Sequence, residues 1–287
     1  MANPIGKIDL HMHTTISDGT DTPQELIGAV KAAGISLFSV TDHDAVKAAE
    51  ILPPLLKGTP LRFIPGVEFS CKDEKGKYHI LGYGFDPRGE AIGSVVAYGH
   101  SLRMKKLLAR LEFLKTEFGF SFSQEEIDRL CALDNPGKPH IGNLMVAYGY
   151  AKTKEEAISQ YIDRVHFKNE YVRPEQAISG ILASGGIPIL AHPFYGSGNE
   201  LILGEEMEER LCRLKEFGLQ GLEAFYSGFS LKLQNEALSL AKKHGFYVTA
   251  GSDYHGTNKL VKLGDNGLDE NADYPDGLLR FLEAVKQ

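Results

Sequence analysis

Two histidines close to the N-terminus, His11 and His13, are separated by a single residue. Side chains two residues apart on an extended strand point to the same face, so both imidazoles can reach one bound ion. Imidazole nitrogens are common ligands of zinc and iron in proteins. Such a pair is also typical of polar residues at the end of a strand, so it indicates a metal site only when other ligands accompany it.

Further histidines and acids accompany predicted β-strands elsewhere in the chain. Asp18 lies in a Ser-Asp-Gly loop, and the others stand at strand ends: His43, Glu68, His79, His192, Asp253 and His255. In a barrel-like parallel fold the carboxyl ends of the strands share one face, where active sites are built. Imidazoles and carboxylates gathered there require a cation that neutralises them. With His11 and His13, these residues predict a multinuclear metal centre.

The elements that must position these residues alternate along most of the chain. Strands are predicted at residues 7–13, 37–43, 62–68, 78–83, 187–192, 221–226 and 247–253. Helices are predicted at residues 22–33, 45–56, 174–184, 204–217 and 230–244. Alternating strands and helices are typical of parallel β/α units, so we expect an α/β fold.

Residues 90–171 break this alternation. Apolar side chains recur at helical spacing within residues 102–117, and further helices are predicted at 124–130, 141–148 and 154–165. A segment of about 80 residues is large enough to hold a small core of its own. We therefore expect a helical insertion, or cap, at residues 90–171 of a barrel-like domain formed by residues 1–89 and 172–287.

Composition excludes several classes of protein. The chain has 287 residues, of which 43% are hydrophobic, enough for one large core or two smaller ones. Its net charge of −7 argues against binding to duplex DNA or to an anionic membrane. No apolar run approaches the roughly 20 residues that span a bilayer. The N-terminus lacks a basic segment followed by a long apolar one, so a cytoplasmic location is expected.

The remaining cysteines and histidines match no motif. Cys71, Cys131 and Cys212 are widely scattered and are predicted to be reduced structural thiols. Three histidines are predicted to be surface or packing residues: His100, His166 and His244.

Taken together, the strand-end motifs resemble the PHP (polymerase and histidinol phosphatase) family of metal-dependent phosphoesterases. The motifs are Asp-Leu-His-Met-His-Thr at 9–14, Ser-Asp-Gly at 17–19, Thr-Asp-His at 41–43, Gly-Val-Glu at 66–68, Ala-His-Pro at 191–193 and Gly-Ser-Asp-Tyr-His at 251–255. The resemblance runs from about residue 8 to about residue 256. It implies a distorted (β/α)7 TIM-like barrel with a trinuclear metal site.

The resemblance also implies how the ligands are grouped, with Glu68 as a bridge. The implied groups are His11, His13, Glu68 and Asp253; Asp18, His43 and His255; and Glu68, His79 and His192. Some members of the family have a histidine where this chain has Asp18, so its second site is slightly harder in character. Two or three divalent ions are implied, with manganese, zinc or iron as candidates and magnesium as a further one.

The predicted insertion narrows the resemblance to one branch of the family. Arg103, the turn Gly137-Lys138-Pro139-His140 and Tyr171 resemble the branch that includes nucleoside 3′,5′-bisphosphate phosphatases and a 5′-to-3′ exoribonuclease acting on short RNA. The turn usually reads Arg-Pro-His there, so Lys138 replaces a planar guanidinium with a point charge. We expect Arg103, Lys138 and His140 to bind phosphate or to protonate the leaving group.

These residues predict hydrolysis of a phosphate monoester on a small nucleotide or the 5′ end of short RNA. Paired metal ions lower the pKa of a bridging water from about 15.7 toward 7, so the hypothesis is in-line attack by a metal-bridging hydroxide. Two alternatives stay open: a histidinol-phosphate phosphatase, which shares the metal ligands, and a non-catalytic PHP module like those fused to replicative polymerases. The oligomeric state is not predicted.

Four further residues have expected supporting roles. Asp9 and Asp42 are expected to orient imidazoles or to cap strand ends. Phe194 and Tyr195 are expected either to stack on a nucleobase or to form a plain wall of the pocket.

Overall fold

The computed structural model describes residues 5–166, 170–195 and 201–285. Residues 1–4, which belong to the segment used to predict the location of the protein, lie outside this range. Among the described helices, none combines the length and the apolar character that crossing a membrane requires.

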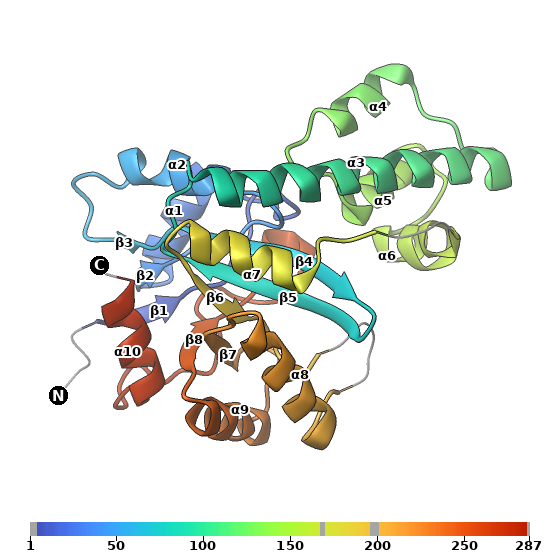
Figure 1. Cartoon of the computed structure of the whole chain (residues 1–287). Coiled ribbons are helices and arrows are strands. Elements are labelled where there is room, and N and C mark those ends of the chain that lie inside the picture. Colours follow the sequence, from blue (N-terminus) through green and yellow to red (C-terminus); the bar gives the residue numbers. More distant parts are fainter. Residues whose placement is uncertain (1–4, 167–169, 196–200, 286–287) are drawn as a thin grey trace.

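The described strands form two sheets (Figure 1). The first sheet is parallel and consists of β1 (Lys7–Asp9), β2 (Ile35–Phe38) and β3 (Arg62–Phe63). The second has the order β4 (Gly66–Asp73), β5 (Gly76–Tyr83), β6 (Ile187–Leu190), β7 (Gly221–Tyr226) and β8 (Tyr247–Gly251). The expected α/β class is confirmed.

Single bridges join the two sheets just beyond the strand ends. Met12 pairs with Tyr254 after β1 and β8, and His43 pairs with Glu68 between the end of β2 and the start of β4. The backbone N–H of Leu10 also donates to the carbonyl of Ala250, at 2.9 Å. The segments that carry the predicted ligands are therefore hydrogen-bonded to one another.

The expectation of parallel strands throughout is wrong at β5, which is antiparallel to both β4 and β6. The strand predicted to end at Glu68 continues to Asp73, turns, and returns as β5. The Asp73 carboxylate accepts the N–H groups of Lys75 and Gly76 and so stabilises the turn. Only nine residues separate the two predicted strands. A parallel crossover needs a dozen or more, so a hairpin is the shorter solution.

Helices flank the sheets as the alternation predicts: α1 (Pro23–Ala32), α2 (Lys47–Leu55), α7 (Pro174–Ala183), α8 (Gly204–Glu216) and α9 (Leu231–His244). The start of α1 is a capping box, in which Thr22 accepts the N–H of Glu25 and the Glu25 carboxylate accepts the N–H of Thr22. A further helix, α10 (Asp276–Ala284), was not predicted.

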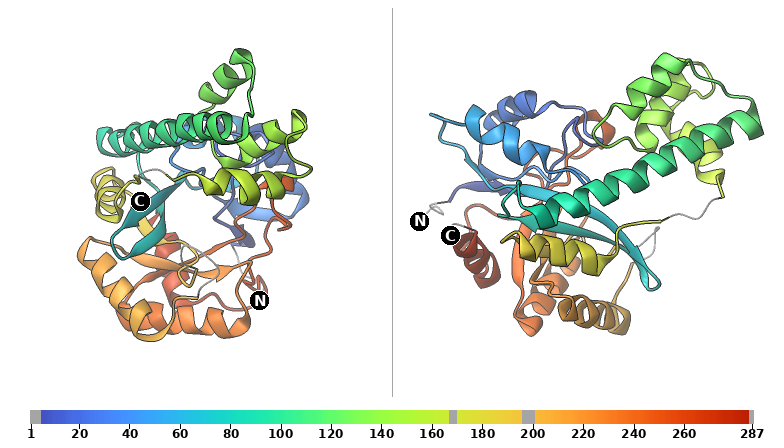
Figure 2. Two further views of the ribbon diagram at one scale, coloured as in Figure 1. Left: turned by 90° about the vertical axis from the view of Figure 1, so that its right-hand side faces the viewer. Right: turned by 45° about the horizontal axis from the view of Figure 1, so that its top comes forward.

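The helical segment projects to one side of the sheets (Figures 1 and 2). It contains α3 (Glu90–Phe118), α4 (Gln124–Cys131), α5 (Lys138–Ala147), α6 (Lys154–Glu156), a π-helical turn (Ala157–Tyr161) and a 3₁₀ turn (Ile162–Arg164). Apolar side chains including Leu107, Leu114 and Ile141 form a cluster of their own. However, Ile92 at the start of α3 belongs to the main core. The boundaries of a separate cap domain therefore stay a prediction.

Candidate metal centre

The structure brings the predicted ligands together around the strand ends. The ligands form three groups, and the ligand atoms within each group all lie within 4.8 Å of one another. The groups are His11, His13, Glu68 and Asp253; His13, Asp18, His43 and His255; and His43, Glu68 and His79. The first group is the implied one. The second contains His13 in addition to the implied residues, and the third contains His43 where His192 was implied.

One carboxylate oxygen of Glu68 lies at the middle of this arrangement. Glu68 Oε2 is 3.2 Å from His11 Nε2, from His13 Nε2 and from His43 Nδ1. Its side chain is only 1% exposed. Three imidazoles from the segments after β1 and β2 therefore face one oxygen.

The other oxygen of Glu68 faces the remaining pair of histidines. Glu68 Oε1 is 2.8 Å from His79 Nδ1 and 3.3 Å from His192 Nε2. His79 reaches it because β5 runs back along β4, which pairs His79 with Ser70, two residues after Glu68. The two oxygens thus face different imidazole sets, as a bridging carboxylate would.

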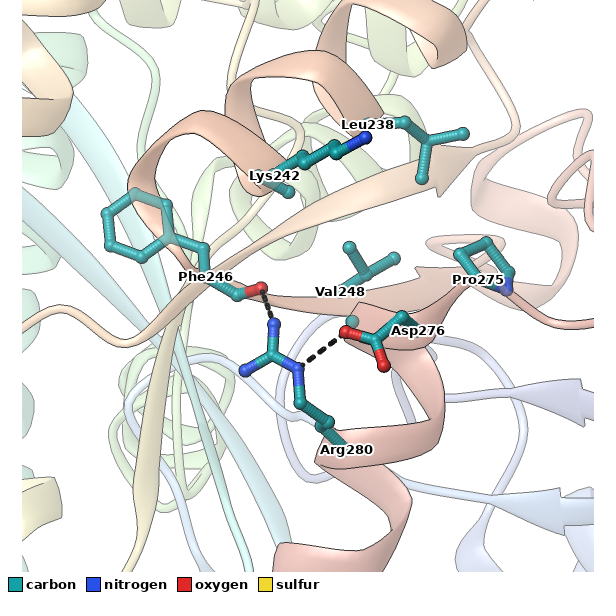
Figure 3. A pocket seen from close by; sticks show the side chains of 9 residues that line it. Leu238, Lys242, Phe246, Val248, Pro275, Asp276 and Arg280 are labelled. Atoms are coloured by element: carbon teal, nitrogen blue, oxygen red, sulfur yellow. Dashed lines mark hydrogen bonds and ion pairs between the residues drawn. The ribbon is translucent and has the colours of Figure 1, made fainter.

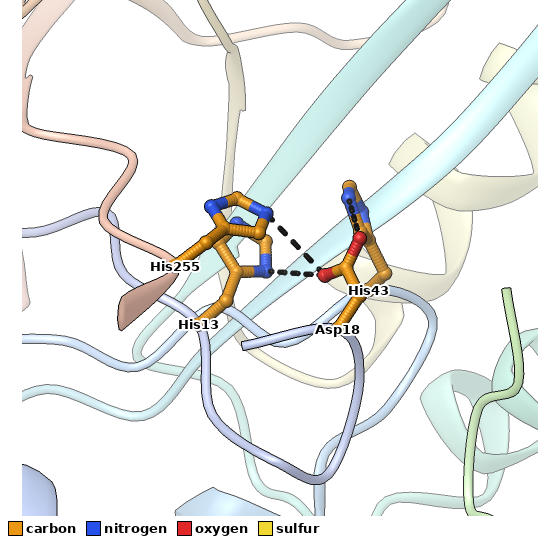
Figure 4. A group of neighbouring side chains, drawn as sticks. All are labelled: His13, Asp18, His43 and His255. Carbon is orange, nitrogen blue, oxygen red and sulfur yellow. Dashed lines mark ion pairs between the residues drawn. The ribbon is translucent and has the colours of Figure 1, made fainter. Parts of the chain in front are cut away.

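Asp18 completes the second group from the loop after His13 (Figure 4). Its Oδ1 lies 3.3 Å from His255 Nε2 and 3.8 Å from His13 Nδ1, and its Oδ2 lies 4.0 Å from His43 Nε2. These separations are longer than most hydrogen bonds, and the four side chains place potential metal ligands around a common space.

Buried polar atoms without partners show that this set fits a cation. His11 Nε2, His13 Nε2, His43 Nδ1, His79 Nδ1 and Glu68 Oε2 are buried, and although they lie close to one another or to Glu68 Oε1, none of them is in hydrogen-bonding geometry. Leaving such an atom unsatisfied costs about 1–3 kcal/mol. Coordination of divalent ions removes this cost, and nitrogen with carboxylate oxygen is a donor set that suits zinc and iron, with oxygen favouring manganese.

Charge in the centre is fixed by burial and by mutual contact. Burial opposes ionisation of Glu68, but His79, His11 and His43 lower the pKa of its carboxyl well below the usual value. Burial lowers the pKa of His43 despite Glu68 and Asp18, and so favours the neutral imidazole that binds metals.

Glu223 on β7 holds two of the histidines and was not predicted. Its Oε1 is 3.0 Å from His11 Nδ1, and its Oε2 accepts the backbone N–H of His192 at 2.9 Å. The residue is fully buried. A carboxylate on the outer nitrogen of an imidazole fixes the ring and leaves the other nitrogen for a metal. The signal in the sequence was an acid inside an apolar strand, where unpaired charge is rare.

Asp253 is held by two further residues that were not predicted. Its Oδ1 faces His13 Nε2 at 3.3 Å, while its Oδ2 accepts from Lys259 Nζ at 2.5 Å and from the Tyr226 hydroxyl at 3.0 Å. Asp253 has a φ of +59° and His192 a φ of +27°. Non-glycine residues adopt such angles at a cost, and these conformations cluster at functional sites.

Gly251, at the end of β8, allows the close approach of His11. A Cβ atom at this position would lie 2.1 Å from His11 Cβ and 2.6 Å from Glu223 Oε1. Only glycine therefore fits where β8 passes the first histidine.

Arg103 on α3 lies against the same strand ends. Its Nε donates to Asp44 Oδ2 at 2.6 Å and its Nη2 donates to Ser70 Oγ at 2.9 Å. Asp44 follows His43, and Ser70 lies two residues after Glu68. Gly99, one turn earlier on α3, is where a Cβ atom would come within 3.3 Å of Asp44 Cβ, so the helix packs closely there.

His140 and Lys138, at the start of α5, face different surroundings. The N–H of Gly137 donates to His140 Nδ1 at 3.0 Å, so the proton of the neutral ring is assigned to Nε2. Burial lowers the pKa of His140, the Asp18 carboxylate opposes this shift and Arg103 adds to it. The ammonium of Lys138 is instead paired with Asp163, and both side chains are exposed.

Comparison with known proteins identifies the family. The family model described as PHP domain matches residues 9–172, which is more than half of the chain. The chain belongs to the PHP domain family. This membership confirms the expected enzyme class, a metal-dependent phosphoesterase.

Relatives of this PHP protein match over most of their length. A 3′,5′-nucleoside bisphosphate phosphatase of Chromobacterium violaceum is 28% identical over 88% of both chains. A 5′-3′ exoribonuclease of Haemophilus influenzae is 26% identical over 91% of this chain and 94% of its own. A phosphoribosyl 1,2-cyclic phosphate 1,2-diphosphodiesterase of Eggerthella lenta is 27% identical over 86% of this chain and 94% of its own.

A solved structure agrees with the fold. A Bifidobacterium adolescentis protein, provisionally named a metal-dependent phosphoesterase, matches with a TM-score of 0.80 and 26% identity, over 99% of this chain and 98% of its own.

Asp9 and Phe194 do not take the first of the two roles expected for each in this PHP protein, and Asp9 fits its alternative role of capping a strand end. The Asp9 carboxylate accepts from Ser252 and from backbone N–H groups, including that of Gly264 at 2.7 Å, rather than orienting an imidazole. Phe194 is fully buried and so cannot stack on a base. Asp42 fits its expected role indirectly, because it accepts from Ser17 Oγ, which lies 3.4 Å from His13 Nδ1.

A cavity of about 510 Å³ lies away from the PHP metal centre, between α9, β8 and α10 (Figure 3). Arg280, which lines it, donates to Asp276 at 2.8 Å and to the carbonyl of Phe246 at 3.0 Å. None of the predicted ligands lines this cavity. The groups suited to phosphate chemistry lie at the metal centre.

Proposed function

We propose that this enzyme hydrolyses a phosphate monoester of a small nucleotide, either a nucleoside 3′,5′-bisphosphate or the 5′ end of a short oligoribonucleotide. The observation that carries this proposal is the position of Arg103. Its guanidinium reaches from the helical segment to Asp44, the residue after His43, and to Ser70, two residues after Glu68. A cation at this place can hold a phosphate that projects from the metal centre.

The proposal includes the metal ligands and the architecture. Two or three ions of manganese, zinc or iron would be held by the nine predicted ligands, with Glu68 as the bridge. When bound, such ions supply a nucleophilic water at neutral pH and neutralise phosphoryl oxygens. The bridges between the two sheets support a distorted (β/α)7 barrel, and the separate apolar cluster supports a cap at residues 90–171.

Arg103, His140 and Lys138 of the helical segment would each have a different role toward the substrate. Arg103 is anchored by two hydrogen bonds, so its planar guanidinium is oriented before phosphate binds. His140 carries its proton on Nε2, the nitrogen that Gly137 does not occupy, and can donate it to a phosphate or to the leaving oxygen. Lys138 would attract a second phosphate in exchange for Asp163.

The names of two relatives support this substrate class. One is a 3′,5′-nucleoside bisphosphate phosphatase and another is a 5′-3′ exoribonuclease, and both align with nearly the whole chain. The first name specifies a nucleoside bisphosphate and the second an RNA, so both point to a substrate built from nucleotides. A small, phosphorylated partner in the cytoplasm is the proposal that fits both.

A substrate panel tests the proposal. The protein is reconstituted with manganese, zinc or magnesium, the bound metal is quantified, and the release of inorganic phosphate and of mononucleotides is followed. The substrates are adenosine 3′,5′-bisphosphate, 5′-phosphorylated RNA trinucleotide, histidinol phosphate and phosphoribosyl 1,2-cyclic phosphate. We expect the first two to give the highest kcat/KM. Preference for histidinol phosphate or for the cyclic phosphate would overturn the substrate class. A metal-loaded protein that hydrolyses none of them would favour a non-catalytic module.

A further inference from the structure

A second set of metal-ligating side chains lies on the outer helices α8 and α9. Glu208 and Cys212 are four residues apart on α8 and so lie on one face of it. His244 is the last residue of α9. Their ligand atoms, a carboxylate oxygen, a sulfur and an imidazole nitrogen, all lie within 4.8 Å of one another.

This triad is separate from the metal centre. His244 precedes β8, which begins at Tyr247, whereas Asp253 and His255 follow the end of that strand at Gly251. The two sets therefore lie at opposite ends of β8, so a metal at one does not share ligands with the other.

His244 is held in place for a ligand role. Its Nε2 lies 2.9 Å from Glu208 Oε2, its ring stacks on Phe246 with centroids 5.3 Å apart, and its carbonyl accepts from Lys215 Nζ at 2.8 Å. Its side chain is 9% exposed. Because the ring is already ordered, binding a metal there costs little side-chain entropy.

The two carboxylate oxygens of Glu208 have different partners. Lys243 Nζ lies 2.6 Å from Glu208 Oε1, which leaves Oε2 facing His244. The ammonium groups of Lys243 and Lys215 disfavour a hard cation that is held by charge alone. A thiolate overcomes this disadvantage only for softer metals, and sulfur with imidazole and carboxylate is a donor set that zinc accepts.

We propose that Glu208, Cys212 and His244 form a zinc site of their own, which links α8 to α9. Binding converts the Cys212 thiol to a thiolate and releases its proton to solvent. Water would fill the fourth position of the tetrahedral ion. A simple ion pair between Glu208 and its two basic neighbours would also hold the helices together, but it gives no role to Cys212. The cysteine therefore distinguishes the two explanations.

Cobalt(II) is the probe for the test, because a thiolate ligand gives it a charge-transfer absorption band in the near ultraviolet. Nitrogen and oxygen ligands of the metal centre do not give this band. In the described part of the chain, no other potential ligand group contains a cysteine. We expect the intact protein to develop the band with one equivalent of thiolate-bound cobalt, Cys212→Ser to lose it, and Cys131→Ser to keep it.

Two further measurements sharpen the result. Zinc should slow alkylation of the exposed Cys212 by at least tenfold, and magnesium should not. Glu208→Gln should weaken cobalt binding at this site at least tenfold, while the phosphoesterase activity of metal-loaded Cys212→Ser stays unchanged. Absence of the band in the intact protein, or its persistence in Cys212→Ser, overturns the proposal. Neither result depends on which phosphate ester the enzyme hydrolyses.

Discussion

The metal centre and the helical segment hold their polar side chains in different ways. At the metal centre, His11, His13 and Glu68 are at most 1% exposed and are fixed from several strands at once. In the helical segment, Arg103 is 18% exposed and contacts Asp44 and Ser70, and Lys138 is 40% exposed and contacts Asp163. The buried set suits ligands that must not move. The partly exposed set suits groups that meet a substrate, so we expect substitutions in the first region to abolish metal binding and those in the second to alter substrate use.

The largest effect is expected for Glu68→Gln. An amide keeps the shape of the side chain but removes the charge that five imidazoles face, so several kcal/mol of metal-dependent stabilisation are lost. Since about 1.4 kcal/mol corresponds to tenfold in rate, kcat should fall by roughly 10³-fold or more. Metal content, measured by elemental analysis, should fall in parallel.

Glu236→Gln is the matched control, because this glutamate is exposed on α9. It should leave metal content and kcat unchanged. If Glu68→Gln retained full metal content and activity, the buried region would not be the catalytic one.

Glu223→Gln should have the next largest effect. It weakens the contact to His11 Nδ1 while the ligands themselves remain. Loss of such a supporting carboxylate typically costs 10–100-fold in metal affinity or activity. Metal dissociation constants measured with a competing chelator would check this. An unchanged affinity would show that β7 contributes only packing.

The ligands of the metal centre could be predicted because most of them end or begin an apolar run in a short motif, and Asp18 lies in a Ser-Asp-Gly loop soon after His13. His11 and His13 are two residues apart, a spacing that places both side chains on one face of a strand, and Asp253 and His255 have the same spacing. Glu223 could not be placed in the same way, since a single acid within Gly-Leu-Glu-Ala-Phe-Tyr has no local partner. Its role comes from β7 lying beside β6 and β8, which is a contact between distant segments.

The fold was predictable where strand and helix alternate, and less so elsewhere. The prediction of parallel strands fails at the β4–β5 hairpin, because it depends on the alternation of strands and helices and no helix lies between these two strands. The helical segment was recognised from the spacing of Leu107, Leu111 and Leu114, but its first helix begins twelve residues before the predicted start. Local spacing cannot show that Arg103 contacts Asp44 and Ser70, because that contact depends on how α3 packs.

Arg103→Lys tests the substrate side of the comparison. Lysine keeps the charge but cannot donate to Asp44 and Ser70 together, so the cation is no longer oriented. Charge-assisted hydrogen bonds are worth about 1.5–3 kcal/mol, which predicts a fall in kcat/KM of roughly 10- to 100-fold. This fall should come mainly from a higher KM, and the metal content should be unchanged. Lys105→Met, an exposed neighbour on α3, is the control. Loss of metal from Arg103→Lys would contradict the division between the regions.

Lys106→Met should change how stability depends on pH. Burial lowers the pKa of the Lys106 ammonium to about 7. The positive charges of Arg103, Arg110 and Lys77 lower this pKa as well, whereas the Asp44 carboxylate raises it. The Tyr171 ring, 3.4 Å from the ammonium, also favours the charged form but does not outweigh burial.

Because the unfolded chain keeps this proton up to a pKa of about 10.5, the free energy of unfolding should rise with pH between 7 and 10. The contribution reaches at most about 1.4 kcal/mol per pH unit. Denaturation at several pH values should show a flatter profile for Lys106→Met than for the intact protein, with Lys105→Met unchanged. Parallel profiles for all three proteins would contradict this assignment.

The smallest effect is expected for Lys138→Met, at the exposed edge of the helical segment. An exposed ion pair contributes about 0–1 kcal/mol, so losing the contact to Asp163 should lower the free energy of unfolding by less than that. If Lys138 binds a second phosphate, kcat/KM for adenosine 3′,5′-bisphosphate should fall about fivefold while that for adenosine 5′-monophosphate does not change. Asp163→Asn should have the opposite effect on the bisphosphate, because it frees the ammonium. Equal losses on both substrates would assign Lys138 to the structure of the α5 start rather than to recognition.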